Sequence, residues 1–144
     1  MTNGPHDLDL SKIWLFSTAS GRDLRTIRRA LEEVTVPAGR MLCEEGTIGR
    51  EFFLIVEGQA SVRRRGRRIA TLGPGQYFGE LALLDRRPRS ATVISETEML
   101  LLVLGQRQFN GVLDAVPPLA RKLLAAMATR LRDADSKASA LISH

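Results

Sequence analysis

The stretch FGELALLDRRPRSATV, residues 78–93, combines a carboxylate and several arginines with small and apolar residues. Gly79 lets the backbone approach a ligand closely, and the helix-forming residues after it predict a single helical turn. The first amides of that turn, those of Glu80, Leu81 and Ala82, lack intrahelical partners and lie at the positive end of the helix dipole. Such an end suits an anion, and the small Ala82 keeps the approach open.

The charged residues of this stretch extend the same interpretation. Arg89 follows Pro88 at the start of a predicted strand, where its guanidinium can hold a phosphate through two parallel hydrogen bonds. Glu80 can accept hydrogen bonds from a neighbouring sugar hydroxyl, as acidic residues do for ribose. Together these groups predict a nucleotide site. A surface ion pair between Glu80 and Arg89, worth about 0–1 kcal/mol, explains the residue types equally well.

The hydrophobic periods divide the chain into three parts. Helical spacing in GRDLRTIRRALEE, residues 21–33, predicts N-terminal helices within 1–33. Short apolar runs separated by glycines predict antiparallel strands over 34–104, and helical spacing returns over 106–143. The predicted fold class is α+β: an antiparallel β-roll or jelly-roll barrel flanked by N-terminal helices and two C-terminal helices. We expect a single domain over 1–144.

Several local patterns place element ends. Ser20 followed three positions later by Asp23 resembles a helix capping box. Two alternating runs on either side of Gly66 predict a hairpin with a basic tip in water. The two prolines at 117–118 are expected to end one helix and start the next.

The last predicted helix carries a seam typical of a coiled coil. We expect this seam to pair two copies of the chain, although packing of the helix on its own domain explains the first leucines equally well. The spacing alternates between three and four residues at Leu124, Met127, Leu131, Ala134, Ala138 and Leu141.

Composition excludes several classes of function. The sequence has 144 residues, of which 44% are hydrophobic and 26% charged, as in soluble globular proteins. The longest apolar run, at 99–104, is too short for a bilayer span, and the N-terminus lacks a signal-peptide pattern. Cys43 is the single cysteine, so a cytoplasmic location is expected. The two histidines, His6 and His144, lie at the ends, so we expect neither a metal site nor a catalytic triad, and no enzyme.

The net charge of +5 raises a nucleic-acid interpretation. The arginines at 63–68 have no interleaved aromatic residues, so a solvated hairpin tip is the favoured explanation. A regulator that binds DNA without sequence specificity stays open as an alternative, and its affinity would fall steeply with salt.

The stretch at 78–93 resembles the phosphate-binding cassette of the cyclic nucleotide-binding domain family. The family pattern is Phe-Gly-Glu-(Leu/Ile)-Ala-Leu, a few variable residues, then Pro-Arg-(Ser/Thr/Ala)-Ala-(Thr/Val)-Val, and residues 78–83 and 88–93 match every defining position. The resemblance covers nearly the whole chain and is of the type seen in catabolite activator proteins and regulatory subunits of cAMP-dependent kinase. The catabolite activators continue into a helix-turn-helix domain, which we do not expect here because the sequence stops at His144.

The resemblance implies a role for each cassette residue. Gly79 would give the turn, Glu80 would bind the ribose 2′-hydroxyl, and Arg89 would neutralise the cyclic phosphate. The ligand-binding residues implied by the resemblance are Gly79, Glu80, Leu81, Ala82, Arg89, Ser90 and Ala91. The candidate base contacts are Ile69, Leu72 and Val93 on the predicted strands and Asp135 on the last helix.

The resemblance implies a cyclic nucleotide sensor that acts through a protein partner or a dimer interface. We expect cAMP as the ligand in preference to cGMP, but Ser90 does not decide between them, because a hydroxyl after the arginine also occurs in family members that bind cGMP. Where the catabolite activators read adenine with hydroxyl residues, this sequence has Ala134 and Asp135. A degenerate member that keeps the fold but no longer binds ligand is therefore a second alternative.

Overall fold

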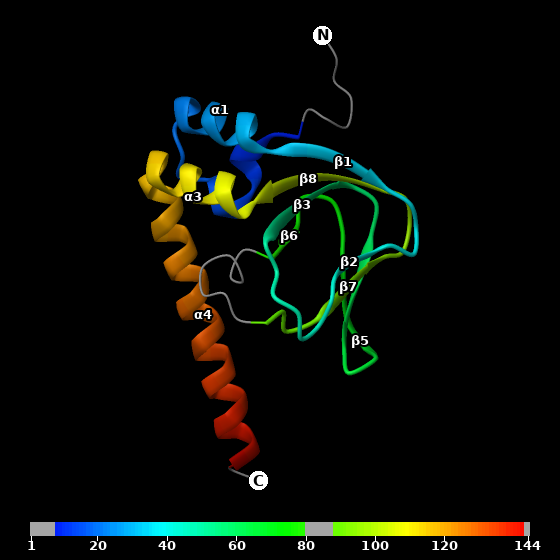
Figure 1. Ribbon diagram of the computed structural model, residues 1–144. Coiled ribbons are helices and arrows are strands. Elements are labelled where there is room, and N and C mark those ends of the chain that lie inside the picture. The colour runs from blue at the N-terminus through cyan, green and yellow to red at the C-terminus, as the bar shows by residue number, and fades with distance from the viewer. Residues whose placement is uncertain (1–7, 80–87, 143–144) are drawn as a thin grey trace.

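Two antiparallel sheets form a roll, and helices from both ends of the chain pack at one side of it (Figure 1). The computed structural model describes residues 8–79 and 88–142, with side chains up to residue 129. The first sheet has the strand order β1-β8-β3-β6, and the second has the order β2-β7-β4-β5. This arrangement confirms the predicted α+β class, with its roll and flanking helices.

In the described residues, eight strands lie between Glu32 and Gly105. They are β1 (Glu32–Val36), β2 (Met41–Cys43), β3 (Glu51–Glu57), β4 (Ala60–Arg64), β5 (Arg67–Leu72), β6 (Tyr77–Phe78), β7 (Thr92–Ser95) and β8 (Met99–Gly105). The helical elements in the part of the chain that the structure describes are η1 (Leu10–Lys12), η2 (Trp14–Phe16), α1 (Gly21–Ala30), α3 (Gln106–Ala115) and α4 (Pro117–Ile142).

Strands β3 and β8 are buried on both faces, which explains why their sequences are apolar without alternation. One face of each strand contributes to a core beneath the helices, through residues such as Phe52 and Leu102. The other face contributes to a second core inside the roll, through residues such as Phe53 and Leu101. Phe52 joins the helices to the roll, since its ring lies 6.4 Å from that of Phe16 and 5.8 Å from that of Tyr77, centroid to centroid.

The N-terminal helix begins as predicted and ends early. The Ser20 hydroxyl accepts a hydrogen bond from the Asp23 amide at 3.0 Å, which confirms the serine half of the capping box. The helix expected over 21–33 stops at Ala30, and β1 begins at Glu32 instead of residue 34. Glu32 and Glu33 pair with β8, so sheet pairing overrides the favourable helix propensity of these glutamates.

The basic hairpin is confirmed. Strands β4 and β5 are joined by Arg65 and Gly66, whose φ angles of 53° and 78° match the two-residue turns that suit the strand twist. Glu45 supports the arginine in this left-handed conformation, because its carboxylate accepts a hydrogen bond from the Arg65 amide at 2.9 Å. The tip lies in solvent, as expected.

The C-terminal helices follow the predicted boundary at the two prolines. Helix α3 ends at Ala115 and α4 begins at Pro117. The first turns of α4 pack on the domain through buried Leu119 and Leu123, and the helix then runs on beyond its first contacts (Figure 1). Leu124, the first residue of the predicted seam, is 65% exposed.

Candidate functional site

Arg89 is the one buried charged side chain in the described part of the chain, with 9% of its surface exposed. Its Nη2 donates a hydrogen bond to the backbone carbonyl of Glu51 at 2.7 Å, at the start of β3. A buried charge is costly unless it is paired and hydrogen-bonded. This position, in the segment where the sequence predicts a phosphate partner, therefore marks the candidate site.

The loop between β2 and β3 fixes the backbone of Arg89. The Arg89 amide donates to the Thr47 carbonyl at 2.7 Å, and the Arg89 carbonyl accepts from the Gly46 amide at 2.9 Å. Ile48 and Pro88 form an isolated antiparallel bridge beside these bonds. The loop between β2 and β3 therefore holds the backbone of Arg89, and Glu51 at the start of β3 holds its guanidinium.

The described surroundings leave the charge of Arg89 without a negative partner. Within residues 8–79 and 88–129, no carboxylate lies within salt-bridge distance of its guanidinium. Burial raises the pKa of the nearby Cys43 thiol to about 11, although Arg89 opposes the shift. Cys43 is therefore a neutral thiol at neutral pH, and it does not balance the arginine. A buried guanidinium held in one orientation offers hydrogen-bond donors of the kind that bind anions.

Residues 33–115, which contain the loop, the strands and Arg89, match the family profile described as cyclic nucleotide-binding domain. The chain belongs to this family. The match covers more than half of the sequence, and it confirms the resemblance seen in the cassette.

Curated relatives of this cyclic nucleotide-binding domain include channel and kinase-regulatory proteins. A cyclic nucleotide-gated potassium channel from Rhizobium etli is 38% identical over 76% of this chain and 30% of the channel. A cAMP-dependent protein kinase regulatory subunit from Pyricularia oryzae is 34% identical over 78% of this chain and 30% of the subunit. The chain thus spans less than a third of the length of these relatives.

Solved structures share the fold. The Thermus thermophilus catabolite activator protein superposes with a TM-score of 0.82 at 29% identity, covering 89% of this chain and 62% of that one. The regulatory domain of Toxoplasma gondii PKA, crystallised with cAMP, gives a TM-score of 0.67 at 34% identity, covering 72% and 41% of the two chains.

A cyclic nucleotide-binding domain of this type is typically non-catalytic. In the described residues, no group of three or more His, Cys, Asp or Glu side chains is placed to hold a metal ion. Of the helices in that same part of the chain, none offers the length of apolar sequence that a bilayer crossing requires.

Some of the predicted phosphate-binding residues are described and some are not. Gly79 and Arg89 lie together, because a Cβ placed on Gly79 would be 2.7 Å from the arginine Nη1. Ser90 is exposed and Ala91 half-buried at the entry to β7. The remaining predicted residues, Glu80, Leu81 and Ala82, and the helical turn expected there, lie outside the described residues.

The candidate base contacts do not share one environment. Val93 is 5% exposed and belongs to the core inside the roll, against which Leu72 packs. Ile69 is the extra residue of a β-bulge, since Ala70 pairs with Val62 and Arg68 with Arg63, and it is 51% exposed. A bulge re-aims the side chain of its extra residue, and Ile69 is the most exposed of these three side chains. The side chain of Asp135 on α4 lies outside the described part.

The arginines of the hairpin make contacts within the domain. Arg68 and Arg63 both approach the Glu96 carboxylate, the second at 3.8 Å, and Arg64 Nε donates to the Ser90 carbonyl at 3.0 Å. The Ser90 contact links the basic tip to the residue after Arg89. The exposed tip was predictable from the sequence but these partners were not, because the pairing of β4 with β7 creates them.

Reasoning from sequence also missed the residues that hold Arg89. They are Gly46, Thr47, Gly49 and Glu51. The repeated glycines in EEGTIGRE were a signal of tight backbone geometry, but nothing in the local pattern shows that this loop faces the cassette.

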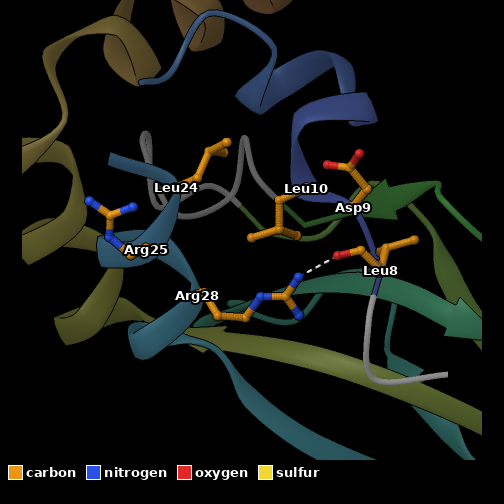
Figure 2. A pocket seen from close by; sticks show the side chains of 6 residues that line it. All are labelled: Leu8, Asp9, Leu10, Leu24, Arg25 and Arg28. Carbon is orange, nitrogen blue, oxygen red and sulfur yellow. Dashed lines mark hydrogen bonds between the residues drawn. The ribbon is translucent and has the colours of Figure 1, made fainter. Parts of the chain in front are cut away.

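A cavity of about 310 Å³ lies away from Arg89, between the N-terminal segment and α1 (Figure 2). Beside it, Arg28 donates a hydrogen bond to the Leu8 carbonyl.

Proposed function

We propose that this chain is a cyclic nucleotide sensor whose ligand is cAMP. The observation that carries the proposal is the buried guanidinium of Arg89, held at the Glu51 carbonyl and without a negative partner among the described residues. Support comes from the family match, from relatives named as cAMP-dependent kinase regulatory subunits, and from a similar structure crystallised with cAMP.

In this proposal Arg89 binds the cyclic phosphate together with the amides of Leu81 and Ala82, and Glu80 binds the ribose 2′-hydroxyl. Gly79 gives the turn, and Ser90 and Ala91 complete the ligand-binding residues at the entry to β7. A guanidinium that is already buried and oriented loses little freedom on binding, which favours affinity.

Selection of the base is the finer part of the proposal. We propose that Ile69, which is exposed at its bulge, contacts the base, and that Leu72 and Val93 support it from the roll core. Asp135, whose side chain lies outside the described part, stays a proposed base contact. We propose cAMP over cGMP because similar proteins include regulatory subunits of cAMP-dependent protein kinase. The proposed location is the cytoplasm, where a free thiol such as Cys43 stays reduced.

Thermal unfolding with added nucleotide tests the proposal. A ligand at 100 times its Kd stabilises a protein by about 2.7 kcal/mol, so saturating cAMP should raise Tm by about 5–10 °C for a domain of this size. We expect a smaller shift with cGMP at the same concentration and none with 5′-AMP, which lacks the cyclic phosphate. If no cyclic nucleotide moves the Tm of protein stripped of bound ligand, the chain is a degenerate scaffold.

The output of the sensor is proposed to pass through α4. Nucleotide binding would neutralise Arg89 and bias the position of the final helix, and with it a homodimer or a protein partner. The exposure of Leu124, at 65%, supports pairing of two copies along the seam.

Leu124→Glu should convert the proposed dimer to a monomer, because it places a charge in an apolar seam. Sedimentation equilibrium measures the change in mass. Ala125→Glu is the matched control, since Ala125 is also exposed but lies outside the seam. A wild-type protein that sediments as a monomer, with and without cAMP, would refute self-pairing.

A further inference from the structure

Gly49 lies in the loop between β2 and β3, at a place where only a glycine leaves room for Arg89. A Cβ added there would lie 1.7 Å from Nε, 2.0 Å from Cζ and 2.3 Å from Nη2 of that arginine. The φ angle of Gly49 is not in the left-handed region. The restriction at this position is therefore one of space and not of backbone conformation.

Gly79 is the second glycine that leaves room for the guanidinium of Arg89. A Cβ there would lie 2.7 Å from Arg89 Nη1 and 2.6 Å from the Glu51 carbonyl oxygen. We call the space bounded by Gly49, Gly79 and the Glu51 carbonyl the arginine socket. Gly46 and Gly73, by contrast, have nothing within 4 Å of an added Cβ.

The socket is assembled by the loop as well as by the cassette. The amide of Gly46 and the carbonyl of Thr47 bond the backbone of Arg89 at 2.9 and 2.7 Å. Hydrogen bonds therefore hold both the backbone and the guanidinium of Arg89, so the planar guanidinium can keep one orientation. Two parallel bonds to a phosphate need such alignment.

We propose that Gly49 is a positioning residue for phosphate binding. Because Gly49 has no side chain, the guanidinium of Arg89 can stay in the socket in the orientation that binds the phosphate. The inference rests on the proposed function. An alanine at this position would be accommodated by the flexible end of the arginine, which swings out of the socket while the surrounding backbone stays in place. The fold would persist and the orientation of the guanidinium would be lost. Affinity for the cyclic phosphate is then set partly by a loop outside the cassette.

The first arm of the test needs no nucleotide. The Nε–H signal of Arg89 is identified in the NMR spectrum of the ligand-free protein by its disappearance in Arg89→Ala. We expect Gly49→Ala to shift this signal and to speed its exchange with water, while Gly73→Ala leaves it unchanged. An unaltered Arg89 signal in folded Gly49→Ala overturns the inference, whatever the protein binds.

The second arm measures cAMP affinity by calorimetry. Gly49→Ala should weaken binding about tenfold or more, the effect of losing a charge-assisted hydrogen bond. Gly73→Ala should bind as wild type does, and Gly49→Ala in the Arg89→Ala background should cause no further loss. Equal cAMP affinity of wild type and Gly49→Ala overturns the inference and leaves the proposed function intact. Absence of binding by the wild type refutes the proposed function, and the NMR arm still decides the socket.

Discussion

Arg89→Ala is expected to weaken cAMP binding by at least about tenfold, since a hydrogen bond to a charged group contributes about 1.5–3 kcal/mol. The reason is specific to this site. The guanidinium is 9% exposed and already held by the Glu51 carbonyl, so in the proposed complex the wild-type protein would offer the phosphate an oriented donor. Calorimetric titration of the two proteins at the same ionic strength measures the difference.

Two further variants distinguish the effect of positive charge on cAMP binding from the effect of the planar guanidinium. Arg89→Lys keeps the positive charge but loses the planar fork, so its affinity should lie between those of wild type and Arg89→Ala. Arg67→Ala removes an exposed arginine on β5, and we expect it to bind cAMP as wild type does. An equal loss in Arg67→Ala and Arg89→Ala would mean that net charge, and not a phosphate contact, drives binding.

Phe52→Ala is expected to lower the free energy of unfolding by about 3–5 kcal/mol. The Phe52 side chain is 1% exposed and contacts the rings of Phe16 and Tyr77. Truncation would leave a cavity where the helices meet the roll. Urea denaturation followed by circular dichroism gives the free energy from the midpoint and slope.

Phe52→Leu is the control for this cavity, since leucine keeps most of the buried apolar surface and should cost much less. A loss below about 1 kcal/mol in Phe52→Ala would show that the two layers of the core do not depend on this ring. The result bears on the site as well, because the Glu51 carbonyl that holds Arg89 directly precedes Phe52.

Much of the fold was predictable because local patterns agree with the tertiary structure. The run MLLLVL predicted a strand, and β8 buries both faces as such a run requires. Gly66 predicted the tight hairpin. The helix end at Ala30 was not predictable, because Glu32 and Glu33 favour helices and only their pairing with β8 makes them a strand.

The sequence predicts which residues of the cassette form the site, but it does not predict the contacts that hold Arg89 in place. Arg89 was identified by its charge and by the cassette around it, and Gly79 by its place before the predicted turn. The socket depends on Gly49 and Glu51, which lie about forty residues earlier along the chain. Such contacts arise from strand pairing across the roll, and a local sequence pattern does not contain them. The exposure of Ile69 similarly follows from a bulge in the pairing of β4 with β5.

Cyclic nucleotide binding is tested most directly by a calorimetric titration of the wild-type protein with cAMP, after any co-purified nucleotide has been removed by unfolding and refolding. We expect saturable binding of one cAMP per chain, with weaker binding of cGMP. Protein that refolds fully, as judged by its circular dichroism, yet binds neither nucleotide would contradict it. The buried charge of Arg89 would then have a structural role in a domain that keeps the family's fold without its ligand.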